Sequence, residues 1–345
     1  MKVLKVKHCQ ELQQYWRNFC FLLRMNLRVL LFILVLAGCK RTSTPLVKPS
    51  SGNINTVTVV IPDMLWQSEV GDAVRAAFAF SAEGLPQQEP IFDLRQMPPE
   101  IFTGFARSSR AILWVGLSDE VVIRTDKDRY ARPQQMTVFS APDTTSLVEM
   151  ILSQSPPVIA SIKQGEIIER QRRTMKSTLK QDVLQTHFDV DLTIPSAYRV
   201  FKESPNTVWF QREIRKGHVN LLVYELPKST PLDWENPLQD IIRIRDSVGK
   251  AFVPGRLEGG HLITEEAYEP YVYFTKVAGL SAIETRGIWE VKGDFMAGPF
   301  VHYLLEDNAN NRYLILEGFV FAPSVAKRDY VFETEAIIRS IHKEK

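Results

Sequence analysis

An unbroken apolar run of eight residues, Val29–Leu36, places the strongest constraint on this chain. The short basic segment Arg24–Arg28 precedes the run, and the small pair Ala37–Gly38 follows it, directly before Cys39. This order is that of the positive region, apolar region and cleavage site of a secretory signal peptide. The run is too short to span a bilayer, which takes roughly 20 residues. We therefore predict that residues 1–38 form a signal peptide.

The residues at the cleavage site are more specific than a general signal. Leu36–Cys39 reads Leu-Ala-Gly-Cys and resembles the lipobox of bacterial lipoproteins, in which the cysteine sulfur receives a diacylglyceryl group before cleavage. The resemblance implies that Cys39 is the lipid attachment site, with palmitate-type acyl chains that hold the protein on a membrane. Met25 opens a compact signal of its own, so we predict that translation starts there.

Cysteine and charge usage narrow the class of protein further. The cysteines are Cys9, Cys20 and Cys39, so the body that follows has neither a disulfide framework nor a cysteine-ligated zinc. A body of about 290 residues buries a sufficient core without such links. After residues 1–38 are removed, 36 basic and 39 acidic side chains remain, for a net charge of −3. This charge gives no reason to expect a nucleic-acid partner.

The first part of the body begins with a linker. Lys40–Asn55 is rich in Ser, Thr and Pro without periodicity, which predicts a flexible tether over residues 39–55. An N-terminal α/β-type unit is expected over 56–155. Its strands are predicted at Thr56–Ile61, Ala111–Leu117 and Gln135–Ala141, and its helices at Glu69–Phe80, at Pro98–Ala106, and from an Asp143 cap through Leu152.

A connecting segment over 156–186 is expected to contain a long amphipathic helix, Gln164–Thr186. Glu166–Arg170 and Glu169–Arg173 are favourable i,i+4 pairs on this helix. Its predicted apolar face consists of Ile168, Met175, Leu179 and Val183. Its excess of Arg and Lys favours a solvated face, with an anionic partner as the alternative; these residues are Arg170, Arg172, Arg173, Lys176 and Lys180.

The C-terminal unit, 187–345, is rich in strands. They are predicted within Phe188–Leu192, Tyr198–Phe201, Val208–Glu213, Leu221–Leu226, His261–Thr264, Tyr271–Lys276, Ile283–Val291, Phe300–Glu306 and Tyr313–Phe321. Asn236–Phe252 is an expected helix, and Ser324 is expected to cap a final helix with an apolar face of Val331, Ile337, Ile338 and Ile341. The pattern predicts an α+β protein of two mixed units, the second an antiparallel sheet packed with helices.

Four segments carry a resemblance to a known family. They are LPQQEPIF (Leu85–Phe92), Ile194–Trp209, RGIWEVKGDFMAGPFVHY (Arg286–Tyr303) and EGFVFAPSVAKRDYVFETEAIIRSI (Glu317–Ile341). The chain resembles domain-of-unknown-function family 4837, a group of Bacteroidota-type envelope lipoproteins, over nearly the whole mature length. The resemblance implies a location and no chemistry. The second unit alone is also similar to the small α+β sandwiches of the PsbP fold, which carries no function.

The charges next to the anchor bear on location. Lipoproteins of the group that this family resembles often carry an acidic run after the cysteine when they reach the cell surface. Here Lys40 and Arg41 follow Cys39, and the first acid is Asp63. We therefore predict a cell-envelope protein on the periplasmic face of the outer membrane.

Histidines supply the main candidates for chemistry. His187, Asp189 and Asp191 alternate along an expected strand and would share one face, but at roughly 7 Å spacing they cannot chelate a metal without a second element. A solvated strand face is the simpler interpretation. His302 is expected to be a hydrogen-bonded core residue, since no nucleophile is identifiable beside it.

The remaining motifs favour structural roles. His261 with Glu265 and Glu266 lacks the helical two-histidine spacing of zinc proteases, and Gly259–Gly260 lacks the pattern of a phosphate loop. Trp289 and Phe295–Phe300 could line a groove, although core aromatics are the simpler interpretation. Lys327–Arg328 could bind an anion near a helix start, with exposed charge as the alternative.

Two functional hypotheses follow. The first is a non-enzymatic, lipid-anchored binding or scaffolding module, with an envelope protein or cell-wall partner besides the membrane. The second is an envelope hydrolase that acts on cell-wall or lipid material, which would need converging titratable groups in one cleft. The sequence identifies no catalytic, cofactor-binding or metal-binding residue and implies no cofactor.

Overall fold

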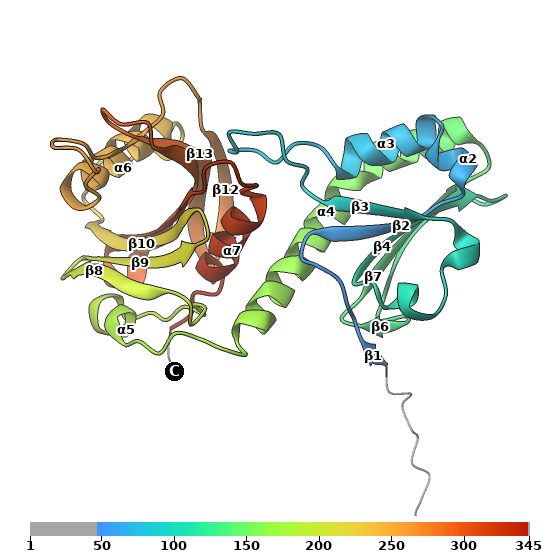
Figure 1. Cartoon of the computed structure of the whole chain (residues 1–345), viewed down its shortest axis with the longest axis horizontal. Coiled ribbons are helices and arrows are strands. Elements are labelled where there is room, and N and C mark those ends of the chain that lie inside the picture. The colour runs from blue at the N-terminus through green and yellow to red at the C-terminus, as the bar shows by residue number, and fades with distance from the viewer. Residues whose placement is uncertain (1–46, 344–345) are drawn as a thin grey trace, which may run out of the picture. The chain divides into compact units, whose positions relative to one another are not determined.

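The structure, a computed structural model, describes residues 47–343 (Figure 1). The predicted signal peptide, Met25 and Cys39 lie outside the described residues. From Lys48 onward the chain forms one compact unit. We call residues 48–175 its N-terminal subdomain and residues 177–343 its C-terminal subdomain. Each subdomain combines helices with a sheet of its own, so the chain is an α+β protein, as the sequence predicts.

The N-terminal subdomain is built on a five-stranded sheet with the order β3-β2-β4-β7-β5. Its strands are β2 (Thr56–Val60), β3 (Asp93–Met97), β4 (Ala111–Leu117), β5 (Val122–Lys127) and β7 (Gln135–Ala141). They run parallel except β5, which is antiparallel to β7. The sequence predicts the three central strands, whose side chains are mostly buried. It misses β3 and β5, because these edge strands are polar and partly exposed.

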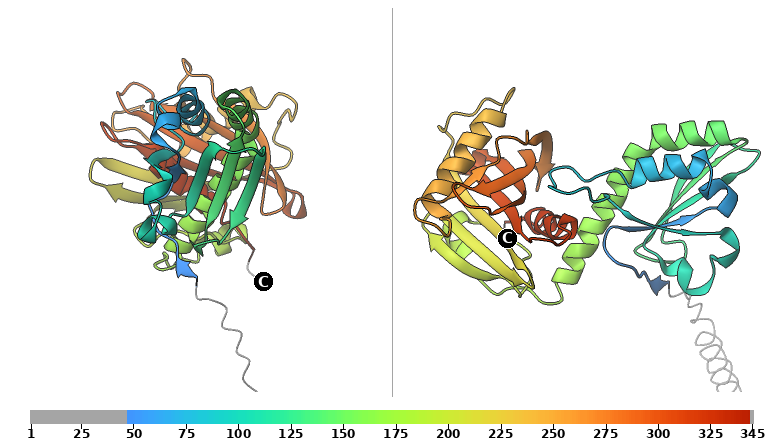
Figure 2. Two further views of the ribbon diagram at one scale, coloured as in Figure 1. Left: turned by 90° about the vertical axis from the view of Figure 1, so that its right-hand side faces the viewer. Right: turned by 45° about the horizontal axis from the view of Figure 1, so that its top comes forward.

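Helices cover one face of this sheet. α3 (Glu69–Phe78) follows the short α2 (Asp63–Trp66), and it packs beside α4 (Thr144–Thr174) over the strands (Figure 2). The expected helix Pro98–Ala106 is divided into two 3₁₀ helices, η1 (Pro99–Ile101) and η2 (Gly104–Ser108).

The last part of the expected tether is docked on this subdomain. Lys48 and Pro49 form a strand, β1 (Lys48–Pro49), that pairs in parallel with β6 (Ala131–Arg132). The amide of Ser51 donates to the carbonyl of Ser108 at 2.8 Å. A flexible tether over the whole of 39–55 is therefore wrong for the residues from Lys48 onward.

A single helix, α4, takes the place of the two helices expected between Asp143 and Thr186. Asp143 caps it as predicted, since the amide of Ser146 donates to its carboxylate at 2.9 Å. The helix continues through Pro156–Pro157 and ends at Thr174. Ile168 and Met175 of the predicted apolar face are exposed, whereas Glu166 and Glu169 are buried. The expected face is wrong within α4, where arginines neutralise these two carboxylates, while Leu179 and Val183 pack against the core beyond the end of the helix.

The C-terminal subdomain contains an eight-stranded antiparallel sheet with the order β11-β13-β14-β15-β10-β9-β8, in which β12 also pairs with β13. The strands are β8 (Arg199–Ser204), β9 (Thr207–Ile214), β10 (Gly217–Pro227), β11 (Leu262–Thr264), β12 (Tyr271–Val277), β13 (Leu280–Val291), β14 (Ala297–Asp307) and β15 (Arg312–Phe321). All eight lie at predicted positions. The sheet is curled, with α6 (Leu238–Phe252) on one face and α7 (Arg328–Ile338) on the other (Figure 1).

The segment predicted as the first strand of this subdomain is not a strand. α5 (Val183–Phe188) occupies its start, and Asp189 ends that helix in the left-handed conformation, with φ +53°. Phe188, Val190 and Leu192 are nevertheless buried. The alternation in the sequence thus reflects burial of a loop and not pairing in a sheet.

The final helix has its predicted buried face but not its predicted cap. Ser324 adopts a positive φ of +59°, and α7 begins only at Arg328. The capping group comes from the other subdomain, because the carboxylate of Glu89 accepts hydrogen bonds from the amides of Lys327 (2.7 Å) and Arg328 (2.9 Å). A carboxylate at a helix start satisfies free amides and interacts favourably with the helix dipole.

No helix among the described residues is long and apolar enough to span a membrane.

Candidate functional site

The segments that carry the family resemblance meet around α7. LPQQEPIF contacts the start of the helix through Glu89. Arg286, the first residue of RGIWEVKGDFMAGPFVHY, donates to Glu335 of α7 at 2.6 Å. Tyr198 donates to Glu333 on the same helix at 2.9 Å. Residues that are far apart in the sequence thus converge on one helix at the junction of the two subdomains.

A small pocket lies at this junction, with a cavity volume of about 40 Å³ and a mouth that is partly open to solvent. The LPQQEPIF region, α4, β13 and α7 all contribute to it. Its apolar wall consists of Ala82, Leu85, Ile91, Val331 and Phe332. Its charged and polar groups belong to Asn55, Glu83, Lys163, Arg286, Arg328 and Glu335. We call it the junction pocket.

Most charges of the junction pocket are already paired. Arg286 binds Glu335 and also Glu284, at 2.5 Å from its Nε. Arg328 reaches across to Asp93 of β3 at 2.9 Å. Burial by itself would raise the pKa of Glu335, but Arg286, Lys163 and Arg339 outweigh it and lower the pKa to about 2. Glu335 therefore stays ionised at neutral pH and is unsuited to proton transfer.

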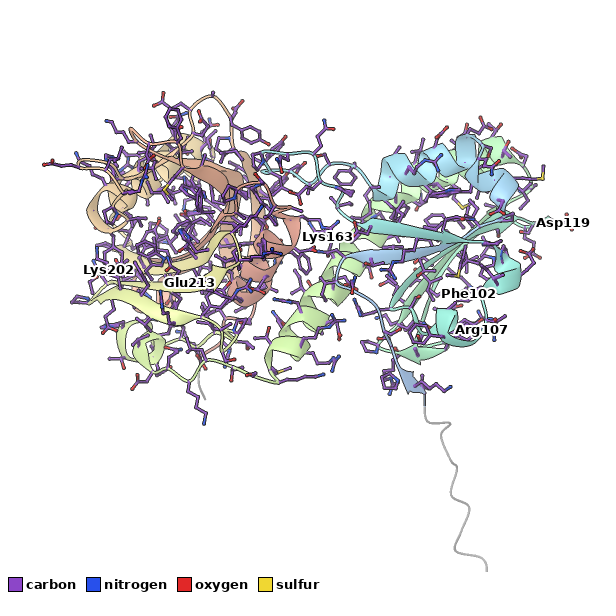
Figure 3. The ribbon with its side chains drawn as sticks, in the orientation of Figure 1. Phe102, Arg107, Asp119, Lys163, Lys202 and Glu213 are labelled. Atoms are coloured by element: carbon purple, nitrogen blue, oxygen red, sulfur yellow. The ribbon has the colours of Figure 1, made fainter. Side chains whose placement is uncertain are left out.

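Lys163 is the exception among these groups. It lies on the part of α4 that faces α7 (Figure 3). Its ammonium contributes to the low pKa of Glu335. Among the described residues it has no ion-pair partner within 4 Å and no hydrogen bond. The pocket thus combines apolar walls with one cation that has no direct partner.

Further ion pairs hold α7 between the subdomains. Arg170 of α4 contacts Glu333, and Arg212 of β9 binds the same carboxylate at 2.8 Å.

Glu166 and Glu169, which the sequence predicts to be solvated, are buried partners of Arg110 and of Arg172 with Arg173. Glu169–Arg173 is the predicted pair, whereas Glu166 is bound by Arg110 in place of Arg170. The arginines of α4 therefore form mainly ion pairs within the protein.

His187 does not share a face with Asp189 and Asp191. It lies on α5, Asp189 accepts a hydrogen bond from Gln185 at 2.9 Å, and Asp191 bridges to His342. Among the described residues, no group of acidic, histidine or cysteine side chains is arranged to hold a metal ion.

His187 does line an open pocket on the C-terminal subdomain, with an empty volume of about 910 Å³ that includes solvent. Asp189, Glu225 and Arg312 also line it. The histidine Nε2 is 3.7 Å from a carboxylate oxygen of Glu203, while Glu225 is bound by Arg312 at 2.6 Å. No serine or cysteine is among the described residues that line this pocket.

His302 is fully buried, as predicted for a core residue, but the predicted hydrogen bond is absent. Neither ring nitrogen has a partner among the described residues. It stands beside Thr285 and Glu317 in the sheet register, and the carboxylate of Glu317 is engaged by Arg245. Burial, with Arg245 nearby, places the pKa of His302 well below its ordinary value of 6.5.

This burial predicts a pH-dependent stability. The unfolded chain takes up a proton on His302 below about pH 6.5, whereas the folded protein does not, so stability falls as the pH drops. Between about pH 6.5 and 5 the expected loss is about 2 kcal/mol. Urea unfolding at both pH values should show a smaller loss in His302→Leu, and an unchanged loss in the exposed control His342→Leu. Equal losses in all three proteins would contradict the assignment.

The other sequence candidates are structural. Trp289 and Phe300 are buried core aromatics, whereas Phe295 is fully exposed on the turn between β13 and β14. Lys327 is buried, which makes the interpretation as exposed charge wrong, and the anion at this helix start is Glu89 of the chain itself. His261 lies in the turn with Gly259, whose carbonyl is 3.1 Å from its Nδ1. Glu265 lies beside Glu290 and helps to raise the pKa of Glu290.

Comparisons with solved structures give remote likenesses. Each of the following matches about 45% of this chain at about 10% identity. The Saccharomyces cerevisiae Ran-binding protein Mog1p is covered over 90% of its length with a TM-score of 0.31. LpqN, involved in cell envelope biogenesis of Mycobacterium tuberculosis, is covered over 81% with a TM-score of 0.28. A Bacteroides thetaiotaomicron protein is covered over 45% with a TM-score of 0.23.

No curated protein matches the sequence. Two protein families do, one after the other along the chain. Residues 50–175, which include the LPQQEPIF segment, match the domain of unknown function DUF8532. The match to family 4837 therefore covers less of the chain than the sequence predicts. Residues 177–340 match the domain of unknown function DUF4837, and this match supports the family resemblance drawn from the sequence.

Proposed function

We propose that this protein is a lipid-anchored, non-enzymatic binding or scaffolding module of the bacterial cell envelope. The lipobox-like Leu36–Cys39 and the signal peptide before it support the anchor and the location. The junction pocket is the proposed binding site, and its ligand is a small acidic group, such as a carboxylate of a cell-wall or protein partner.

The state of the charges around the junction pocket carries this proposal. Arg286, Arg328 and Glu335 are held in ion pairs, and the low pKa of Glu335 removes it as a general acid or base near neutral pH. Lys163 is left as a cation beside apolar walls. Such a site favours an anionic group with an apolar body, and it offers no proton-transfer pair.

Succinate is a suitable probe for this site. Ligand linkage predicts that succinate at about a hundred times its Kd stabilises the full chain by about 2.7 kcal/mol. Lys163→Gln should lose most of this gain, and Lys176→Gln, which alters an exposed lysine just after α4, should keep it. Thermal unfolding with and without succinate is the measurement. An absent gain in the wild type, or an equal gain in Lys163→Gln, would count against the proposed site.

The proposed location is the periplasmic face of the outer membrane, because the charges that follow Cys39 are basic. Protease added to intact cells should then leave the protein whole and cut it once the outer membrane is breached. Digestion on intact cells would contradict this face.

One observation favours the alternative function, an envelope hydrolase. His187 lies in an open pocket with the carboxylates of Asp189 and Glu225, as a general base would require. Among the lining residues, Thr186 is the only one with a hydroxyl group. A wall- or lipid-hydrolysing activity that is lost in His187→Ala and kept in His261→Ala would establish the alternative.

A further inference from the structure

A compact basic and aromatic surface lies where the described chain begins. Pairing of β1 with β6 places Lys48 opposite Ala131 and Pro49 opposite Arg132. Two residues further on, the hydroxyl groups of Ser51 and Ser108 are 2.7 Å apart, which joins this segment to η2. We define the Phe105 surface by the side chains of Lys48, Phe105, Arg107, Arg129 and Arg132.

Contacts around one ring hold the centre of this surface together. The guanidinium carbons of Arg107 and Arg129 lie 5.1 Å and 5.4 Å from the centre of the Tyr130 ring. Phe102 meets the same ring edge-on, with ring centres 5.9 Å apart. Figure 3 labels Phe102 and Arg107 in this part of the N-terminal subdomain. Arg107 and Arg129 therefore pack against an aromatic ring that Phe102 also contacts.

Phe105 stands out from these aromatic contacts. It belongs to η2, whose backbone is fixed because the hydroxyl group of Ser108 donates to the carbonyl of Phe105 at 2.7 Å. Its side chain is nevertheless 82% exposed. An exposed phenylalanine beside basic residues is a composition found at membrane surfaces, since the apolar ring can enter the boundary between headgroups and acyl chains while the cations meet anionic lipid.

The charge of the Phe105 surface is positive overall. Arg129 is paired with Asp126 at 2.9 Å, and Arg132 with Asp128 at 2.7 Å. Lys48 and Arg107 have no carboxylate partner among the described residues. Two cations therefore remain after these ion pairs are formed, and this surface complements an anionic one.

The chain length between the anchor and this surface is short. Lys48 lies nine positions after Cys39, so their Cα atoms can be at most about 30 Å apart. A random-coil chain of nine residues has a root-mean-square span of about 17 Å. A lipid on Cys39 would therefore keep β1 and its neighbours close to the membrane.

We propose that the Phe105 surface rests on the membrane that holds the lipid anchor, with Phe105 among the headgroups and the arginines beside anionic phosphates. This inference depends on the proposed lipidation of Cys39. It adds an orientation: the end of the N-terminal subdomain at β1 faces the bilayer and acts as a second membrane contact, which stable anchoring uses.

The test uses the full mature, acylated protein in vesicles of phosphatidylethanolamine and phosphatidylglycerol. The mature chain has no cysteine besides the acylated Cys39, so Phe105→Cys gives a single site for a fluorescent label. Phe295→Cys is the matched control, because Phe295 is likewise an exposed phenylalanine but lies in the C-terminal subdomain. We expect brominated lipid to quench most of the fluorescence at position 105 and almost none at position 295.

Reversing charges on the Phe105 surface distinguishes its membrane contact from the lipid anchor on Cys39. Arg129→Glu with Arg132→Glu should abolish quenching at position 105, whereas reversal of the exposed pair Lys176 and Lys180 should not. Flotation of the vesicles reports the anchor independently. Protein that floats but is equally unquenched at positions 105 and 295 would overturn this inference and leave the anchor intact. Protein that does not float would overturn both.

Discussion

Replacing Glu317 by alanine is expected to destabilise the fold by about 3–5 kcal/mol, the cost of breaking a buried ion pair. Both nitrogens of the Arg245 fork bind the Glu317 carboxylate, at 3.0 Å and 2.7 Å. The arginine is almost fully buried between α6 and the sheet, with its guanidinium 3.5 Å from the ring centre of Phe300. Without the carboxylate, this charge would be left in the core without compensation.

Urea unfolding measures this effect, and two variants control it. The double variant Arg245→Met with Glu317→Leu removes both charges and should recover most of the stability. Glu213→Ala breaks an exposed pair with Arg199 and should cost less than about 1 kcal/mol. A loss in Glu317→Ala as small as that in Glu213→Ala would show that the buried pair does not stabilise the fold.

Replacing Cys39 by serine is expected to move nearly all of the protein from the membrane fraction to the soluble fraction. One myristoyl chain gives an association constant of only about 10⁴ M⁻¹, and stable anchoring takes two signals. When this variant is exported behind a cleavable signal peptide without a lipobox, it carries no acyl chain, and what remains of the membrane contact is the Phe105 surface. Fractionation of cells is the measurement, with Ser43→Ala as a control that should leave the distribution unchanged. A Cys39→Ser protein that stays in the membrane would disprove the anchor.

The sequence predicts the sheets better than the helices of this protein. β4, β7 and the strands of the C-terminal subdomain have long apolar or alternating runs, because their burial is repeated along the strand. α4 shows the opposite case. Glu166 and Glu169 resemble exposed helix positions in the sequence, but Arg110, which directly precedes the distant strand β4, neutralises the first in the interior. The hydrophobic periodicity of a segment cannot reveal an ion-pair partner that only the fold brings close to it.

The junction pocket is beyond prediction for the same reason. Glu83, Lys163, Arg286 and Glu335 are separated by many residues, and each resembles an ordinary surface charge where it stands. The four segments of the family resemblance indicated which parts of the chain matter, but not that they meet around α7. Glu89 illustrates the point, since nothing in LPQQEPIF indicates that its glutamate caps a helix 238 residues further along.

Mass spectrometry of the N-terminal peptide, released from the protein in its native membranes, tests the central claim most directly. A lipid-anchored envelope module should begin at Cys39, with acyl chains on both the sulfur and the amino group of that residue. Translation from Met1 or Met25 makes no difference to this peptide, because cleavage removes both. An N-terminal peptide that begins before Cys39, or a Cys39 with a free thiol, would contradict the account.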